Sequence, residues 1–205
     1  MKTLLLVDIQ NDFVPGGALA VKEGDKIVPL VNALQNRFDR VVATKDWHPA
    51  GHGSFASSHP GRKVGDIIEL NGLSQILWPD HCIQNSPGAE FHPHLDTTHI
   101  EKVIFKGTDP GIDSYSGFYD NGRRKATGLK QYLDAKGVKR LYVCGLATDY
   151  CVKFTVLDAL AEGFETYLIE DACRGVELNR GDVARALDEM KAGGCHIISS
   201  AELLA

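Results

Sequence analysis

Cys151 has the clearest capacity for chemistry in this chain, because it stands where an apolar segment gives way to a helical pattern. Residues 139–145 (KRLYVCG) form a short apolar run, and the positions that follow recur at helical spacing: Val152, Thr155, Val156, Ala159 and Leu160. We expect Thr148 or Asp149 to cap this helix and Gly163 to end it. In its first turn, unpaired backbone N–H groups and the helix dipole favour a thiolate and can hold an oxyanion. The alternative is that Cys151 is a small buried hydrophobic residue.

Two other reactive residues end apolar runs. Asp8 follows TLLLV and Lys106 follows KVIF. A cysteine attacks a carbonyl group as the thiolate, so it needs a base. Asp8 is our candidate, because burial raises the pKa of a carboxylate and Lys106 nearby stabilises whichever anion is present. The residues indicate a triad of Asp8, Lys106 and Cys151; the alternative is a buried salt bridge between Asp8 and Lys106 beside an inert thiol.

Asp46, His48 and His81 are candidate metal ligands. Asp46 and His48 stand two positions apart in a segment that should be extended, so their side chains point the same way and Trp47 points elsewhere. The segment WPDHC supplies His81 as the third ligand. Two imidazoles and a carboxylate suit a divalent ion such as Zn, Fe(II) or Mn(II), with positions left for water or substrate. His52 is a candidate fourth ligand whose position the sequence does not determine.

The elements that must position these residues form an alternating series. Apolar runs alternate with amphipathic stretches along the chain, which predicts βαβ units. Six such runs predict a doubly wound α/β fold: a mostly parallel six-stranded sheet with helices on both faces, in a Rossmann-like three-layer arrangement. In such sheets ligands bind beyond the carboxyl ends of the strands, where we expect Asp8, Asp46, Lys106 and Cys151 to meet.

Residues 46–98 are the exception to this alternation. They are rich in His, Gly, Pro and Ser, show little periodicity, and are too long for a plain connection in a compact domain. We expect this loop region to carry the metal ligands. The length and the absence of a linker predict a single domain of residues 1–205.

The composition argues against several classes of protein. Hydrophobic residues make up 43% and charged residues 24% of the 205 residues, as in an ordinary globular protein. A net charge of −5 without a basic run argues against nucleic acid as a partner. No stretch of about 18 apolar residues occurs, and the apolar part of the N-terminus is too short for a signal peptide, so we expect no membrane association. No stripe or patch decides the oligomeric state, and a homo-oligomer is left open.

The cysteines favour a reducing compartment. They are odd in number and lack a CxxC spacing, which suggests neither a disulfide framework nor a zinc knuckle: Cys82, Cys144, Cys151, Cys173 and Cys195. We therefore expect the protein in the cytoplasm.

Five segments resemble, in the same order, the motifs of a known family. They are VDIQNDFVPGGAL, TKDWHPAGHGSF, WPDHCIQNSPGAEFHP, FKGTDPGIDSYSGFYDN and CGLATDYCVKFTVLDA, and they span nearly the whole chain. The family is that of the nicotinamidases and pyrazinamidases, within the isochorismatase-like cysteine hydrolases. No departure occurs at a position that the family's mechanism needs.

The resemblance implies a role for each matched residue. Asp8, Lys106 and Cys151 match the triad of the family, and its metal ligands match Asp46, His48 and His81. His52 matches a position whose metal contact varies. The resemblance also implies a cis peptide bond between Leu146 and Ala147, and an oxyanion hole formed by the N–H groups of Ala147 and Cys151.

The reaction that the resemblance implies is hydrolysis of nicotinamide to nicotinate and ammonia through a Cys151 thioester, as a step of NAD salvage, with pyrazinamide as a further substrate. Asp8 takes the thiol proton and returns it to ammonia, and water activated by Asp8 or delivered from the metal releases nicotinate. In the family the metal also binds the ring nitrogen of the substrate. We expect the pocket wall to consist of Phe13, Trp78, Tyr115, Leu146 and Ala147; the alternative for the aromatic residues is ordinary core.

Three other functions fit parts of the sequence. One is another hydrolase of the superfamily, such as an isochorismatase or a carbamoyl-amide hydrolase, which would act on a different small molecule. The isochorismatase branch does not use the cysteine. Neither of these two enzymes is expected to need the metal ligands Asp46, His48 and His81. A non-haem Fe(II) enzyme could use the Asp/His/His set, although that set is normally carried on a β-barrel. A metal-binding module without catalysis would leave the joint placement of Asp8, Lys106 and Cys151 unexplained.

Overall fold

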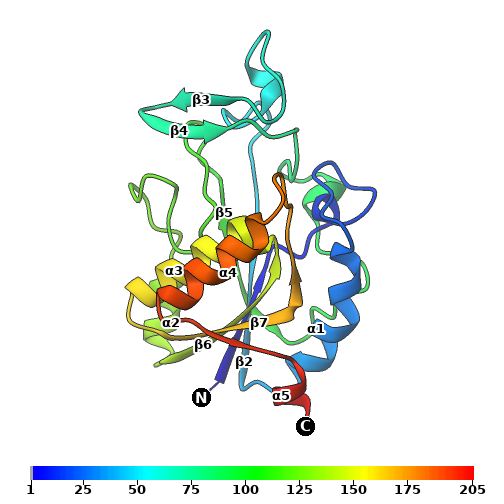
Figure 1. The fold of residues 1–205 in the computed structure, drawn as a ribbon, viewed down its shortest axis with the longest axis vertical. Helices are drawn as coiled ribbons and strands as arrows, with labels where there is room; N and C mark the ends of the chain where they lie inside the picture. Colours follow the sequence, from blue (N-terminus) through cyan, green and yellow to red (C-terminus); the bar gives the residue numbers. More distant parts are fainter. Residues whose placement is uncertain (1) are drawn as a thin grey trace.

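The computed structural model describes residues 2–205, and its centre is a six-stranded parallel sheet (Figure 1). The strands are β1 Lys2–Val7, β2 Arg40–Asp46, β5 Ile100–Lys106, β6 Arg140–Leu146, β7 Glu165–Arg174 and β8 His196–Ile198, in the order β5-β2-β1-β6-β7-β8. Leu4, Leu5 and Leu6 of the central strand are all fully buried. Burial on both faces explains why this strand reads as a continuous apolar run. The predicted doubly wound α/β fold is confirmed, and the single domain of residues 1–205 stays a prediction.

Helices cover both faces of the sheet. They are α1 Val28–Gln35, α2 Leu129–Ala135, α3 Lys153–Ala161, α4 Asp182–Ala192 and α5 Ala201–Leu204. In Figure 1, α2, α3 and α4 lie to one side of the sheet and α1 and α5 to the other. Helix α4 shows why its sequence folds this way: Ala186 and Met190, one turn apart, are buried, whereas most of its charged residues face solvent. Single helical turns complete the fold: η1 Asn11–Phe13, η2 Gly24–Ile27, η3 Ala56–Ser58, η4 Pro87–Ala89 and η5 Thr148–Val152.

The loop region of residues 46–98 contains a small hairpin that the sequence did not predict. Strand β3 Ile67–Leu70 pairs antiparallel with β4 Leu73–Ile76. The turn consists of Asn71 and Gly72, both with positive φ, which is the residue pair that a two-residue hairpin turn favours. Each strand has only four residues, too few to show a period. The hairpin stands beyond the carboxyl edge of the sheet (Figure 1).

The strand order reverses at β1, which has β2 on one side and β6 on the other. Loops that leave β1 and β6 therefore diverge and open a crevice at the carboxyl edge. Asp8 follows β1 and Cys151 follows β6, while Asp46 and Lys106 are the last residues of β2 and β5. Four adjacent strands thus deliver the four residues to one edge of the sheet, as the sequence predicted.

Candidate active site

The helical turn that carries Cys151 begins at Ala147. Tyr150 N and Val152 N both donate to Ala147 O, each over 3.1 Å, so this turn, η5, is wider than an α-helical turn, and α3 continues it. Cys151 lies in this first helical stretch after β6, as expected. The peptide bond between Leu146 and Ala147 is cis, as the resemblance implies.

The predicted N-cap is wrong, whereas Gly163, with a φ of +86°, follows the end of α3 as predicted. Neither Thr148 nor Asp149 caps the turn, because Ala147 occupies the cap position without a side-chain hydrogen bond. The Asp149 carboxylate instead accepts from Val176 N and Glu177 N, each over 2.8 Å. Its partners lie in a segment remote in sequence, and no local pattern shows them.

Gly145 lets β6 approach β1 just before this turn. Its φ is +127°, and a Cβ atom at this position would lie 2.1 Å from Val7 O. A side chain would therefore collide with the backbone of β1 and would also strain its own conformation. The glycine therefore allows β6 to pair closely with β1 directly before the Cys151 turn.

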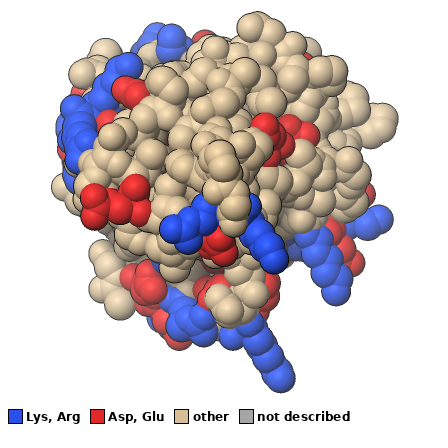
Figure 2. Space-filling model, turned by 90° about the horizontal axis from the view of Figure 1, so that it is seen from above, with Lys and Arg blue, Asp and Glu red and all other residues tan. Residues whose placement is uncertain are grey.

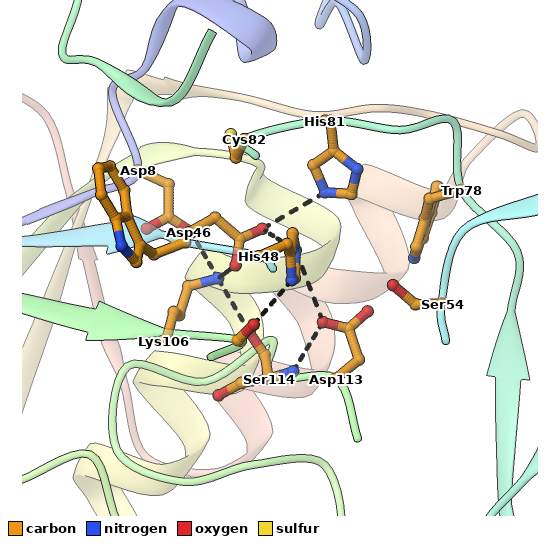
Figure 3. A network of polar contacts seen from close by, with 12 residues as sticks. Asp8, Asp46, His48, Ser54, Trp78, His81, Cys82, Lys106, Asp113 and Ser114 are labelled. Carbon is orange, nitrogen blue, oxygen red and sulfur yellow. Dashed lines mark hydrogen bonds and ion pairs between the residues drawn. The ribbon is translucent and has the colours of Figure 1, made fainter. Parts of the chain in front are cut away.

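Lys106 is the point at which the charged groups of the site meet (Figure 3). Its Nζ lies 2.8 Å from Asp8 Oδ2, 2.9 Å from Asp46 Oδ1 and 3.4 Å from Cys151 Sγ, and donates to Ser114 O over 2.9 Å. Burial alone would lower the pKa of Lys106, but the charges of Asp46 and Asp8 raise that pKa well above its usual value. Lys106 is therefore a buried ammonium group that offsets two buried carboxylates.

Asp8 has the properties of a base. It is fully buried, and its backbone has a φ of +48° just beyond β1. Burial raises the pKa of Asp8 above its usual value, although Lys106 and a hydrogen bond from Thr44 lower it. Thr44 Oγ1 donates this bond to Asp8 Oδ1 over 2.6 Å. The net rise makes Asp8 a stronger base than an exposed carboxylate.

The surroundings of Cys151 favour the thiol over the thiolate. Burial raises the pKa of Cys151 well above its usual value, and the charge of Lys106 lowers it without reversing the shift. Burial outweighs the nearby cation, which agrees with the expectation that a base must take the thiol proton. The thiol keeps its proton until a base takes it.

Asp46, His48 and His81 converge, as the sequence predicted (Figure 3). His48 Nε2 lies 3.1 Å and His81 Nε2 3.4 Å from Asp46 Oδ2. The Nδ1 atoms face backbone carbonyl groups, at 2.9 Å from Gly107 O for His48 and 2.8 Å from Pro79 O for His81. Because a carbonyl oxygen only accepts, each Nδ1 carries a proton, and in the neutral imidazole each Nε2 presents a lone pair to the carboxylate.

This donor set fits a divalent cation. His48 Nε2 is buried without a hydrogen-bond partner, and in the neutral imidazole its lone pair faces a carboxylate. That arrangement is repulsive unless a proton or a metal cation lies between the two groups; without a metal, burial lowers the pKa of His48, but the charge of Asp46 raises that pKa above its usual value. Backbone carbonyl groups that orient the second nitrogen are typical of metal-binding histidines. The identity of the ion is not determined by these ligands.

His52 differs from the two other histidines. Its Nδ1 contacts Ser54 Oγ at 2.8 Å and its Nε2 contacts Asp109 O at 2.7 Å, so both ring nitrogens have protein partners. The ring packs against that of His48, with centroids 4.4 Å apart. Asp113, which the sequence analysis passed over, completes a second group of potential ligands with these two histidines. It stands within the fourth matched motif, which is the signal that could have identified it.

A narrow pocket with about 30 Å³ of free space opens over these groups. It is lined by Phe13, Leu19, Asp46, Trp78, His81, Asp113, Tyr115, Ala147, Tyr150, Cys151 and Val176. Phe13, Trp78, Tyr115 and Ala147 thus lie where the sequence analysis expected them. Leu146 is set behind this lining, with a fully buried side chain in the core. No sequence pattern singles out the unpredicted lining residues, since separate loops and turns bring them together.

Two buried or half-buried side chains of the first matched motif position the metal-ligand segments. Gln10 Oε1 accepts from Asp46 N, and Gln10 Nε2 donates to Asp46 O, each over 2.8 Å. Asp12 Oδ2 accepts from Cys82 N over 2.7 Å, directly after His81. Both side chains fix the backbone beside a candidate ligand, and their place in the motif VDIQNDFVPGGAL is the signal that could have found them.

The surface above the carboxyl edge carries charges of both signs. Figure 2 shows Lys and Arg interspersed with Asp and Glu on this face. Within residues 2–205, no helix is both long and apolar enough to cross a membrane. The dense group of buried charges around Lys106 contrasts with this mixed surface.

Comparison with known proteins decides the family. The isochorismatase domain matches residues 2–202. The chain belongs to the isochorismatase family. This match confirms the resemblance seen in the five motifs and agrees with the observed fold.

Within the family, the chain is similar to nicotinamidases. It is 52% identical to the nicotinamidase of Escherichia coli (strain K12), over 98% of this chain and 96% of that protein. It superposes with a TM-score of 0.96 and 47% identity on an Acinetobacter baumanii nicotinamidase/pyrazinamidase, covering 99% of this chain and 98% of that one. The pyrazinamidase of Pyrococcus horikoshii in complex with zinc gives a TM-score of 0.78 at 44% identity, covering 97% and 98%. The chain is accordingly an enzyme of the hydrolase class.

Proposed function

We propose that this amide hydrolase converts nicotinamide to nicotinate and ammonia, and that it also accepts pyrazinamide. The observation that carries the proposal is the position of the Lys106 ammonium group, 2.8 Å from Asp8 Oδ2 and 3.4 Å from Cys151 Sγ, beneath an aromatic pocket. The similarity to nicotinamidases and pyrazinamidases supports these substrates. We further propose that the reaction serves NAD salvage in the cytoplasm.

The reaction begins with a proton transfer. Asp8, whose pKa burial raises, accepts the proton of the Cys151 thiol. Lys106 stays protonated and stabilises the thiolate that forms. The thiolate attacks the carboxamide carbon, and the backbone N–H groups of Ala147 and Cys151 donate to the oxyanion.

Acylation and hydrolysis then share one base. Asp8 returns its proton to the nitrogen as the C–N bond breaks, so that ammonia leaves and the acyl group stays on Cys151 as a thioester. Asp8, again a carboxylate, takes a proton from the water that attacks this thioester. The C–S bond breaks, the Cys151 thiolate recovers that proton from Asp8, and the nicotinic acid that forms loses its own proton to water and leaves as nicotinate. One water molecule is consumed for each ammonia formed.

The pocket selects a flat, apolar ring. Phe13 and Trp78 offer aromatic surface to a pyridine or pyrazine ring. Tyr115 Oη accepts from Trp78 Nε1 and from Gln75 Nε2, each over 3.1 Å, which holds both aromatic residues in place. A substrate that fills so small a space excludes bulk water from the thioester.

Asp46, His48 and His81 would hold one divalent ion, either Zn, Fe(II) or Mn(II). When bound, the ion supplies a Lewis-acid contact for the ring nitrogen of the substrate. The zinc complex of the P. horikoshii relative supports a metal at this position. Lys106 contacts both Asp46 and Asp8, so the same ammonium group fixes the positions of a candidate metal ligand and of the proposed base relative to each other.

Release of ammonia from nicotinamide tests this proposal. The metal-loaded wild-type protein should release ammonia and nicotinate in equal amounts. Cys151→Ala should lower kcat by about a thousandfold or more, as loss of a nucleophile does. The melting temperature should change little, because only one sulfur atom is removed. Cys195→Ala, which also removes a buried thiol, is the matched control and should keep wild-type turnover. A wild-type protein inactive on both amides would refute the proposed function, and an active Cys151→Ala variant would refute the mechanism.

A further inference from the structure

Val176 lies between the pocket over Cys151 and a much larger groove. Among residues 2–205, it is the one residue that lines both cavities. The pocket holds about 30 Å³ of free space, and the groove about 730 Å³. The groove runs along the end of β7 and α4, where Cys173, Val183 and Leu187 line it. The Val176 side chain is therefore the partition between the narrow pocket over Cys151 and the larger groove.

The segment that carries Val176 is held from both sides. Val176 N and Glu177 N donate to the two oxygens of the Asp149 carboxylate, each over 2.8 Å. The Glu177 carboxylate accepts in turn from Gly181 N over 2.5 Å and from Val183 N over 3.2 Å, at the start of α4. The partition is thus fixed to the Cys151 turn on one side and to α4 on the other.

Val176 lies at the rim of the pocket. Leu19, Tyr150 and Val176 are partly exposed, whereas Asp46 and Cys151 at the base of the pocket are buried. A substituent that does not fit the base of the pocket must therefore pass a rim residue. Of these, Val176 borders the larger free volume, about 730 Å³, whereas Tyr150 borders a separate groove of about 360 Å³.

We propose that Val176 determines the size of the substrates, so that the enzyme excludes aromatic carboxamides that carry an alkyl group on the ring or on the amide nitrogen. The inference rests on the proposed amidase function and specifies the substrate class of the same site. Removal of two methyl groups in Val176→Ala joins the pocket to the groove and gives such a substituent room. Discrimination by one methylene in an apolar pocket amounts to about 10–200-fold, which sets the expected scale.

The first test compares three amides on matched variants. We measure kcat/KM for nicotinamide, N-methylnicotinamide and 5-methylnicotinamide with the wild type, Val176→Ala and Leu187→Ala. Leu187 lines the groove and not the pocket, so its truncation removes aliphatic surface without opening the partition. In Val176→Ala, kcat/KM for at least one methylated amide relative to nicotinamide should rise about tenfold or more. Unchanged ratios for both methylated amides, or an equal rise in Leu187→Ala, would overturn the inference.

A second test does not depend on nicotinamide turnover. Alkylation of Cys151 is followed by peptide mapping with a small reagent, iodoacetamide, and a bulky one, N-phenylmaleimide. The rate ratio of bulky to small reagent at Cys151 should rise about tenfold in Val176→Ala and stay at the wild-type value in Leu187→Ala. If the wild type fails to hydrolyse nicotinamide, the proposed function fails, while this ratio still decides whether Val176 forms the partition. A ratio that does not rise overturns the inference.

Discussion

At the scale of single residues, Lys106 joins the two halves of the site. An ammonium group has three N–H donors, and four acceptors surround this one within 3.4 Å: Asp8, Asp46, Cys151 and the carbonyl oxygen of Ser114. The positive charge stabilises both carboxylates in a place where water cannot. The pKa of Asp8 then depends on its burial and on its other neighbours, among them Thr44.

Thr44 lowers the pKa of Asp8 through a single hydrogen bond. Its hydroxyl donates to Asp8 Oδ1 over 2.6 Å and thereby favours the ionised carboxylate. In Thr44→Val this bond is lost, so the pKa of Asp8 rises further above its usual value. In the proposed mechanism the deprotonated form of Asp8 is the base, so activity should be lost as the pH falls through this pKa. The acid limb of the kcat/KM profile should therefore move to higher pH.

The control for this pH profile is Thr166→Val. Thr166 is also buried in a strand of the sheet, and its hydroxyl donates to Phe164 O over 2.9 Å, away from the site. Its replacement should leave the acid limb where the wild type has it. An acid limb of Thr44→Val that stays in place or moves to lower pH would contradict the assignment of Asp8 as the base.

At the scale of elements, the turns directly after the strands decide the geometry of the site. The turn after β5 contains Gly107, whose carbonyl oxygen orients the His48 ring. Gly107 has a φ of +64°, and a Cβ atom there would lie 2.5 Å from Cε1 and 2.7 Å from Nδ1 of His48. The missing side chain thus makes room for a candidate metal ligand.

Gly107→Ala should displace His48 and weaken metal binding. We expect about a 10–100-fold loss in metal affinity, the range seen when groups behind the ligands are changed. The measurement is metal content per chain after dialysis against a metal buffer, with circular dichroism to confirm the fold. Gly51→Ala is the matched control, because Gly51 also has positive φ, at +73°, but a Cβ atom would meet nothing within 4 Å. Equal metal content in both variants would count against His48 as a ligand.

The elements themselves could be predicted to different degrees. The central strands and the main helices were predictable, because burial on two faces gives apolar runs and burial on one face gives helical spacing. The hairpin β3–β4 was not, since its strands are too short to show a period. The prediction of the N-cap of the Cys151 turn was wrong because Asp149 accepts from Val176 N and Glu177 N, which lie in a loop distant in sequence.

At the scale of the whole molecule, the point where the strand order reverses explains why the reactive residues meet. Strand ends can be recognised in a sequence, so Asp8, Asp46, Lys106 and Cys151 could be placed at one edge before their distances were known. The wall residues Leu19, Tyr150 and Val176 could not, because a pocket wall depends on how loops pack. The raised pKa of the Cys151 thiol could not be predicted either, since it depends on burial in the folded chain.

The fold also helps to distinguish between the alternative functions. A non-haem Fe(II) enzyme would carry its Asp/His/His set on a β-barrel, whereas the set here lies beside an open parallel sheet. The function of a metal-binding module would not explain why Lys106 lies between the buried carboxylate of Asp8 and the buried thiol of Cys151. The molecule as a whole therefore favours a hydrolase with a cysteine nucleophile.

The central claim is that Cys151 carries the acyl group during turnover. The most direct test is acid quenching of the metal-loaded enzyme during turnover of nicotinamide, followed by peptide mass mapping. The account predicts a nicotinoyl group on the peptide that contains Cys151, and none on that peptide in Cys151→Ala. Steady formation of nicotinate with no acyl group on Cys151, and with turnover retained by Cys151→Ala, would contradict it.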